Sequence, residues 1–64
     1  MNTEIKKYLE ESLQNKKGLT FYVNGNTVNG YVIRIVDDNS VEVRNRSSSK
    51  VLVLLDRLDA IAMS

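Results

Sequence analysis

The chain contains no cysteine, histidine, proline or tryptophan. The lack of cysteine excludes a disulfide, and the lack of both cysteine and histidine excludes ordinary zinc, iron–sulfur and haem sites. Without histidine there is no Ser–His or Cys–His nucleophile pair, and no side chain whose ordinary pKa lies near neutrality. We therefore expect no metal site, no cofactor, no catalytic residues and no enzyme activity.

A chain of 64 residues is expected to form one domain, residues 1–64, with a small core. Domains of this size usually need a disulfide, a metal or a partner subunit, and only the last of these remains. The formal charge of +1 does not indicate a highly basic nucleic-acid coat protein. The longest apolar run, residues 51–55, is too short to span a membrane, and the N-terminus lacks an apolar signal segment. These features predict a cytoplasmic protein.

The first segment has the apolar spacing of a helix over about residues 3–17. The stripe consists of Ile5, Tyr8, Leu9 and Leu13. Asn2 or Thr3 is the expected N-cap. Lys16 and Lys17 are expected in the last turn, and Gly18 is expected to end the helix.

Alternating apolar residues predict five short antiparallel strands between about residues 19 and 63. Asn24-Gly25 predicts a hairpin, and Gly30 predicts a bend or bulge within the second strand. Beyond Gly30, one face of that strand is expected to carry Tyr31, Ile33 and Ile35. The run at 51–55 lacks alternation, which is typical of a strand buried on both faces. The domain's own core can cover one face, and the helix or another subunit must cover the other.

This order of a helix and five strands resembles the Sm-like family, which includes the Sm and LSm proteins and bacterial Hfq. The segment FYVNGNTVNGYVIRIVDD carries most of the likeness, with an Asn-Gly turn, Gly30 where the second strand bends, and Asp37 or Asp38 as the acidic residue closing that strand. The segment VLVLLDRLDAIAM is similar to the second Sm motif. The resemblance implies a mainly β fold with an N-terminal helix, in which five antiparallel strands form a bent barrel of the small SH3-like or OB-like kind.

The chain departs from the family pattern at three places. The family spacing from the bend glycine to the acidic residue is about six, whereas Asp37 lies seven residues after Gly30, which implies a bulge or a shifted register. Asn39-Ser40 stands where the family often has an aromatic or long apolar side chain. Asp56-Arg57 stands where the second motif carries Arg-Gly or Lys-His.

The resemblance implies a homo-oligomeric ring of about five to seven subunits, in which the fourth strand of one subunit pairs with the fifth strand of the next. Such pairing would give the run at 51–55 its second buried face. The residues expected at the subunit interface are Val51, Leu52, Val53, Leu54, Leu55, Leu58, Ala60 and Ile61.

The resemblance also implies that two turns bind single-stranded RNA around a pore. The matching residues are Asp38 and Asn39 in one turn and Asp56 and Arg57 in the other. Arg57 can bond a phosphate or stack on a base, and Asn39 can contact a base edge. The alternative is that the first turn is merely shaped by its polar side chains and that Arg57 pairs with Asp56 or Asp59. A ring of Asp56 carboxylates would repel phosphate.

A second candidate site is the polar loop that follows residue 44. Arg44, Arg46 and Lys50 flank its serines, and a ring of such loops would form a basic band able to follow a nucleic-acid backbone. The alternative is an ordinary solvated loop. Tyr22 and Tyr31 are further candidates for base stacking, although the face shared with Ile33 and Ile35 favours a packing role for Tyr31.

Two functions are compatible with this pattern. The first is a small Sm-like ring that binds RNA as a scaffold or chaperone. The second is an Sm-like or SH3-like oligomer that serves as a structural or protein-interaction module without RNA. The basic loop and Arg57 favour the first function, while the near-neutral charge and the missing stacking residue favour the second.

Overall fold

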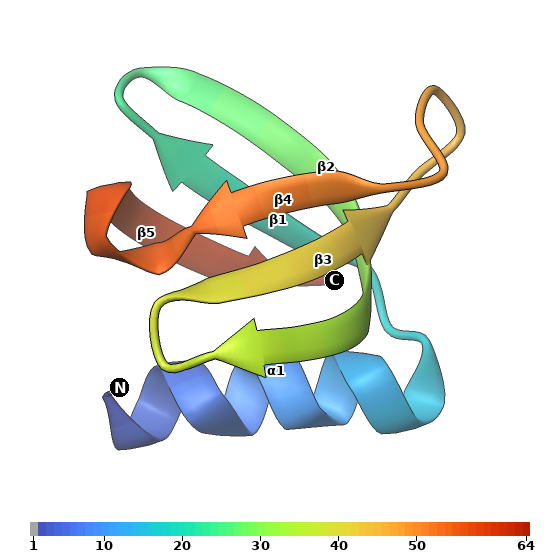
Figure 1. The fold of residues 1–64 in the computed structure, drawn as a ribbon, viewed down its shortest axis with the longest axis horizontal. Coiled ribbons are helices and arrows are strands. Elements are labelled where there is room, and N and C mark those ends of the chain that lie inside the picture. The colour runs from blue at the N-terminus through green and yellow to red at the C-terminus, as the bar shows by residue number, and fades with distance from the viewer. Residues whose placement is uncertain (1) are drawn as a thin grey trace.

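The computed structural model describes residues 2–64, in which an N-terminal helix lies against a strongly bent sheet of five antiparallel strands (Figure 1). The elements are α1 (Thr3–Asn15), β1 (Leu19–Val23), β2 (Asn26–Asp37), β3 (Ser40–Arg44), β4 (Val51–Leu54), a 3-10 turn η1 (Leu55–Arg57) and β5 (Leu58–Met63). The expected helix and five strands are confirmed. The strand order is β4-β3-β2-β1-β5, so β4 and β5 are the two edges of an open sheet.

Helix α1 begins at a side-chain cap and ends earlier than the sequence predicts. The Asn2 carboxamide oxygen accepts hydrogen bonds from the backbone N–H groups of Glu4 and Ile5, at 2.8 and 3.3 Å, which confirms Asn2 as the N-cap. Lys16 already adopts the left-handed conformation, with φ of 56°, so the helix ends at Asn15. The prediction that Lys16 and Lys17 lie in the last turn and that Gly18 ends the helix is therefore wrong.

The helix buries Leu9 fully and packs Ile5 and Tyr8 against the core. Leu13, predicted in the same stripe, remains 38% exposed. Ser12 takes the fully buried position instead. Its hydroxyl donates to the carbonyl of Lys17 at 2.6 Å and accepts from the backbone N–H of Val32 in β2 at 2.9 Å. A single serine thus joins the end of α1 to the sheet.

Strand β2 belongs to both halves of the sheet and changes partner at Gly30. Residues 26–30 pair with β1, and the remainder of the strand pairs with β3, beginning with Tyr31 opposite Arg44. A Cβ at Gly30 would collide with the main-chain oxygen of Arg44 and would lie 2.6 Å from the Cγ1 of Val43. The bend expected at Gly30 therefore depends on a close approach of β3 that leaves no room for a side chain.

Two bulges interrupt the pairing of β2 with β3. The register advances by two residues on β2 and one on β3 between Val32 and Arg34, and again between Ile35 and Asp37. These extra residues accommodate the long spacing between Gly30 and Asp37, which confirms the expected bulge. They also change the faces: Val32 is fully buried, and Ile35 packs against the core three residues later. The expected alternation of Tyr31, Ile33 and Ile35 on one face is therefore wrong.

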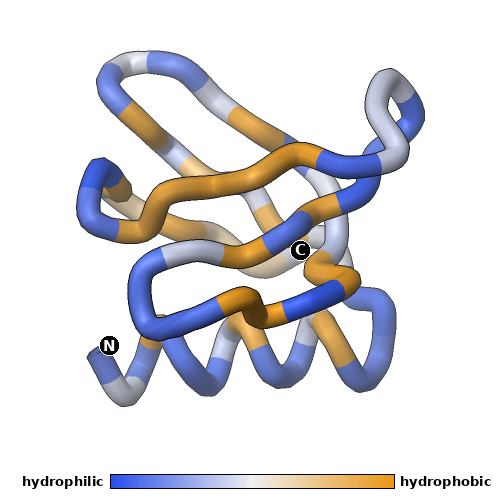
Figure 2. The backbone as a smooth tube through the Cα atoms, viewed as in Figure 1, coloured by the Kyte–Doolittle hydropathy of each residue, from blue (hydrophilic) through white to orange (hydrophobic). Residues whose placement is uncertain are grey.

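The core lies between the two halves of the sheet and α1. Its fully or nearly fully buried apolar side chains are Leu9, Leu19, Phe21, Val32, Val41, Val43 and Val53. The apolar run of β4 is visible as a continuous hydrophobic segment (Figure 2). Only one face of that run is covered within the chain, because Val53 is buried while Leu52 and Leu54 are 58% and 44% exposed.

Candidate nucleic-acid interface

The β2–β3 turn is shaped by Asp37. Its carboxylate oxygen Oδ1 accepts hydrogen bonds from the backbone N–H of Asn39 at 2.8 Å and from the hydroxyl of Ser40 at 2.9 Å. These two bonds lower the pKa of Asp37 below its ordinary value. Asp37 is thus the carboxylate that closes the strand and orders the turn, while Asp38 and Asn39 are exposed at its tip.

The fold brings the two sequence-predicted turns together. Ser40 pairs with Leu54, and the backbone N–H of Leu55 donates to the carbonyl of Asn39 at 2.7 Å. We call this region the turn end, defined by Asp38, Asn39, Asp56 and Arg57. It lies at the left of Figure 1, where β2 passes to β3 and β4 passes to η1.

Carboxylates outnumber cations at the turn end. Asp37 and Asp59 flank the four residues that define it, so four aspartates accompany Arg57. Asp59 is engaged, because its Oδ2 accepts from the backbone N–H of Asn24 at 3.0 Å. The three ion pairs found within residues 2–64 do not include Arg57, so its alternative role as a partner of Asp56 or Asp59 has no ion pair to support it. This end is electrostatically unfavourable for phosphate.

Loop 45–50 lies at the opposite end of β3 and β4 and is organised by Asn45. The Asn45 oxygen Oδ1 accepts from the backbone N–H groups of Ser47 and Ser48, at 3.0 and 2.8 Å, and its Nδ2 donates to the carbonyl of Asn29 in β2 at 2.8 Å. The Asn45 N–H also donates to the carbonyl of Ser48 at 3.0 Å. The loop is therefore a hydrogen-bonded unit anchored to the sheet rather than a free polar segment.

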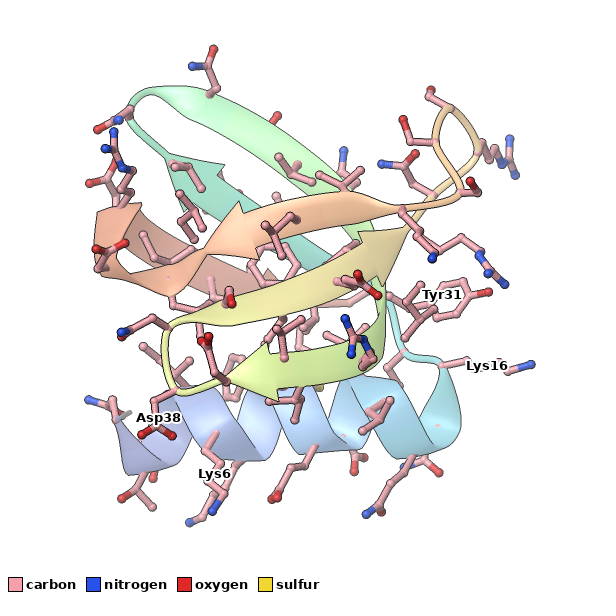
Figure 3. All side chains as sticks on the ribbon, viewed as in Figure 1. Lys6, Lys16, Tyr31 and Asp38 are labelled. Carbon is pink, nitrogen blue, oxygen red and sulfur yellow. The ribbon has the colours of Figure 1, made fainter. Side chains whose placement is uncertain are left out.

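A group of cations lies at this end of the molecule, at the end of β3, on loop 45–50 and at the end of α1. We call it the basic end, defined by Lys16, Arg44, Arg46 and Lys50. Figure 3 shows Lys16 and Tyr31 projecting from the end of the molecule opposite to Asp38. None of the four cations belongs to an ion pair within residues 2–64, whereas the neighbouring Lys17 pairs with Glu11 at 3.5 Å. Their charges remain available to an anion.

An open groove of about 820 Å³ lies at the basic end, between the bend of β2 and loop 45–50. Its walls come from Gly18, residues 27–31 of β2, residues 44–47 and Val51. Two arginines and one tyrosine line it, and no side chain lining it within residues 2–64 is acidic. The volume falls in the range of small-ligand sites, about 300–1,000 Å³.

Arg34 and Glu42 form an ion pair on the outer face of β2 and β3. Two guanidinium nitrogens contact the two Glu42 oxygens at 3.2 and 3.3 Å. The hydrogen bonds from Arg34, together with its charge, lower the pKa of Glu42, and the charge of Lys50 adds to the effect. The charge of Arg34 is thus neutralised locally, unlike the charges of Arg44 and Arg46, which form no ion pair within residues 2–64.

The expected interface residues do not all face outward. Val53 belongs to the chain's own core, and Val51, Leu55, Leu58 and Ile61 pack partly against it. Leu52, Leu54 and Ala60 are the exposed members of the set. A second, shallow apolar groove of about 210 Å³ runs between β4 and the β1–β2 hairpin, with Arg57 at its border.

The sequence predicted Arg44, Arg46 and Lys50 as basic site residues, but it predicted neither the part of Lys16 in the basic end nor the groove. Asn45 and Asn29 were missed because their roles depend on contacts between segments far apart in the chain. The Asn-Arg-Ser-Ser-Ser composition was the available signal, since asparagine often bonds the backbone two or three residues ahead.

No protein-family model matches the chain, and no characterised protein is similar to it in sequence. No helix within residues 2–64 is long and apolar enough to cross a membrane. In the same residues, no group of three or more carboxylate, histidine or cysteine side chains is placed to hold a metal ion.

Proposed function

We propose that the chain is an Sm-like subunit that forms a homo-oligomeric ring in the cytoplasm and binds single-stranded RNA as a scaffold or chaperone. Support for the family comes from the arrangement of the elements. An N-terminal helix precedes five antiparallel strands, the second strand bends at a glycine, and the fourth and fifth strands are the free edges of the sheet. This arrangement agrees with the resemblance seen in the sequence.

Assembly is supported by the free edge of β4. An unpaired strand edge offers backbone N–H and C=O groups to another strand. On this edge Leu52 and Leu54 point away from the chain's own core. Pairing with β5 of a second copy would satisfy the edge and cover these leucines, and a closed rotation would limit the number of subunits.

The two faces of β4 give a matched test of assembly. Leu52→Asp changes an exposed side chain, so each chain should remain folded while the oligomer dissociates. Val53→Asp places a charge in the core and should unfold the chain. Light scattering measures the mass and circular dichroism measures the fold. A parent protein that is monomeric at micromolar concentration would contradict assembly.

The observation that carries RNA binding is the groove at the basic end, where Arg44 and Arg46 have no carboxylate partner among residues 2–64. Phosphate contacts supply most of the affinity of sequence-independent binding and make it dependent on salt. We therefore assign the principal RNA contact to the basic end. The aspartates of the turn end make that surface the weaker candidate.

Charge-matched variants test this assignment. The double variant Arg44→Gln/Arg46→Gln and the control Lys6→Gln/Lys7→Gln each remove two exposed positive charges, the second pair from α1. Fluorescence anisotropy with short uridine-rich and adenosine-rich RNA, at two or more salt concentrations, gives the affinity and its salt slope. We expect the arginine variant alone to weaken both RNAs and to reduce the slope by about one to two.

Two other results would contradict the assignment. If the two double variants lose the same amount of RNA affinity, only the net charge of the protein affects binding. If Arg57→Ala abolishes RNA binding while Arg44→Gln/Arg46→Gln still binds RNA, the RNA binds at the turn end.

The second candidate function is a structural or protein-interaction module without RNA. The specific observation that favours it is the excess of aspartates at the turn end. The resemblance implies that RNA binds around a pore at these same turns. Absence of binding to either RNA at low salt, in an oligomer that is otherwise intact, would establish this second function in place of the first.

A further inference from the structure

The groove at the basic end contains more than positive charge. Tyr31 lies directly opposite Arg44 in the pairing of β2 with β3, and both side chains line the groove. Residues opposite each other on antiparallel strands have Cβ atoms about 5 Å apart. Tyr31 and Arg44 therefore leave the two strands at neighbouring positions on the groove wall.

Arg44 is held in this position from the other side of the loop. Its Nε donates to the carbonyl of Ser49 at 3.3 Å, which leaves the two terminal nitrogens of the guanidinium without a protein partner within residues 2–64. Because Asn45 orders the loop that supplies Ser49, Arg44 is oriented before any ligand binds. Arg46 follows on the same loop and also lines the groove.

Two glycines line the groove, and neither adds a side chain to it. Gly30 is required at the bend by the close approach of Arg44 and Val43. Gly18 lines the groove where the chain leaves α1 for β1. Tyr31, which is half-buried, lines the groove together with these two glycines.

We infer that this groove binds one nucleotide unit of single-stranded RNA in each subunit, with the base stacked on Tyr31 and the adjoining phosphates on Arg44 and Arg46. This inference rests on the proposed RNA binding and adds a base contact to it. Stacking on an aromatic ring tolerates any base, and an arginine beside the ring strengthens it. All the lining residues come from one chain, so the contact does not require a neighbouring subunit.

The test compares an ordinary oligonucleotide with one that lacks bases. The probes are a uridine hexamer and a hexamer of abasic ribose phosphate, which carry the same phosphates. If the base stacks, the parent should bind the uridine hexamer at least about fivefold more tightly. Tyr31→Leu should remove that difference and leave the salt slope unchanged, while Tyr31→Phe, which keeps the ring, should retain it.

Tyr22→Leu is the matched control. Tyr22 is an exposed tyrosine on the same sheet, but it lies on β1 and does not line the groove. We expect this variant to discriminate between the two probes as the parent does. If Tyr22→Leu instead of Tyr31→Leu removes the discrimination, the base stacks elsewhere and the inference is wrong.

The outcomes also separate the inference from the function on which it rests. Equal affinity of the parent for the two hexamers would overturn the base contact while leaving backbone binding intact. No binding of either hexamer at low salt would overturn both.

Discussion

Replacing Ser12 with alanine tests how the helix is fastened to the sheet. Ser12 is fully buried, and its hydroxyl is the only side-chain group that accepts the Val32 N–H within residues 2–64. The same hydroxyl donates to the Lys17 carbonyl, which lies just beyond the end of α1. Ser12→Ala removes one oxygen atom and leaves a buried donor in β2 and an acceptor after the helix without this partner.

The magnitude follows from two opposing effects. Leaving a buried polar group without a partner costs about 1–3 kcal/mol. Alanine is the better helix former and recovers about 0.5 kcal/mol. The net loss should therefore be about 0.5–2.5 kcal/mol, and in a domain of this size each kcal/mol lowers the melting temperature by about 4–8 °C.

The assay is thermal unfolding followed by circular dichroism at a fixed chain concentration, because the stability of an oligomer depends on concentration. Gln14→Ala is the control, since it introduces alanine at an exposed position of the same helix. Hydrogen exchange should also show faster exchange of the Val32 amide in Ser12→Ala alone. A Ser12→Ala protein that melts as high as Gln14→Ala, with an unchanged Val32 amide, would refute the reasoning.

Three further predictions concern the bend, the loop and the carboxylates. Gly30→Val should lower the free energy of unfolding by about 1–3 kcal/mol, because the new side chain overpacks against β3. Gly18→Ala should lower it less, because its new Cβ would meet only the Ser64 hydroxyl at 3.5 Å. Equal melting temperatures of the two variants would contradict the close approach of β3 to Gly30. Asn45→Ala should speed amide exchange across residues 46–49, and unchanged protection would show that the loop does not depend on Asn45. Because folding lowers the pKa of Asp37 and Glu42, their stabilisation is complete above their ordinary values of 3.8 and 4.5 and is lost as the pH falls further. The urea concentration at the midpoint of unfolding should fall between pH 7 and 3. This dependence on pH should be weaker in Asp37→Asn/Glu42→Gln.

Local patterns were sufficient to predict the helix, the number of strands and the hairpin at Asn24-Gly25. They failed where a distant contact decides the outcome. Leu13 was predicted in the apolar stripe but is 38% exposed, and no prediction was made for Ser12, which is fully buried. The burial of Ser12 depends on an unpaired N–H in the bulged part of β2, which no helix pattern contains.

The charged residues of the candidate site were identifiable from the sequence, but their grouping was not. Antiparallel pairing of β3 with β4 brings Asn39 to Leu55 at one end and Arg44 to Ser49 at the other. The pairing of Tyr31 with Arg44 depends in addition on the register of β2 with β3. Regular alternation could not predict the faces of this strand, because the bulge between Val32 and Arg34 interrupts the alternation and both Val32 and Ile35 contribute to the core.

The cations of the basic end and the aspartates of the turn end lie at opposite ends of β3 and β4, so the local charge differs in sign between the two ends. A polyanion that approaches from solution is attracted by the end that carries Arg44 and Arg46 and repelled by the end that carries Asp38 and Asp56. The preferred orientation is therefore selected during the encounter, before any group touches. It follows that ionic strength should act strongly on the rate of association, and that mutations at the aspartate-rich end should alter this rate without any contact with the bound strand.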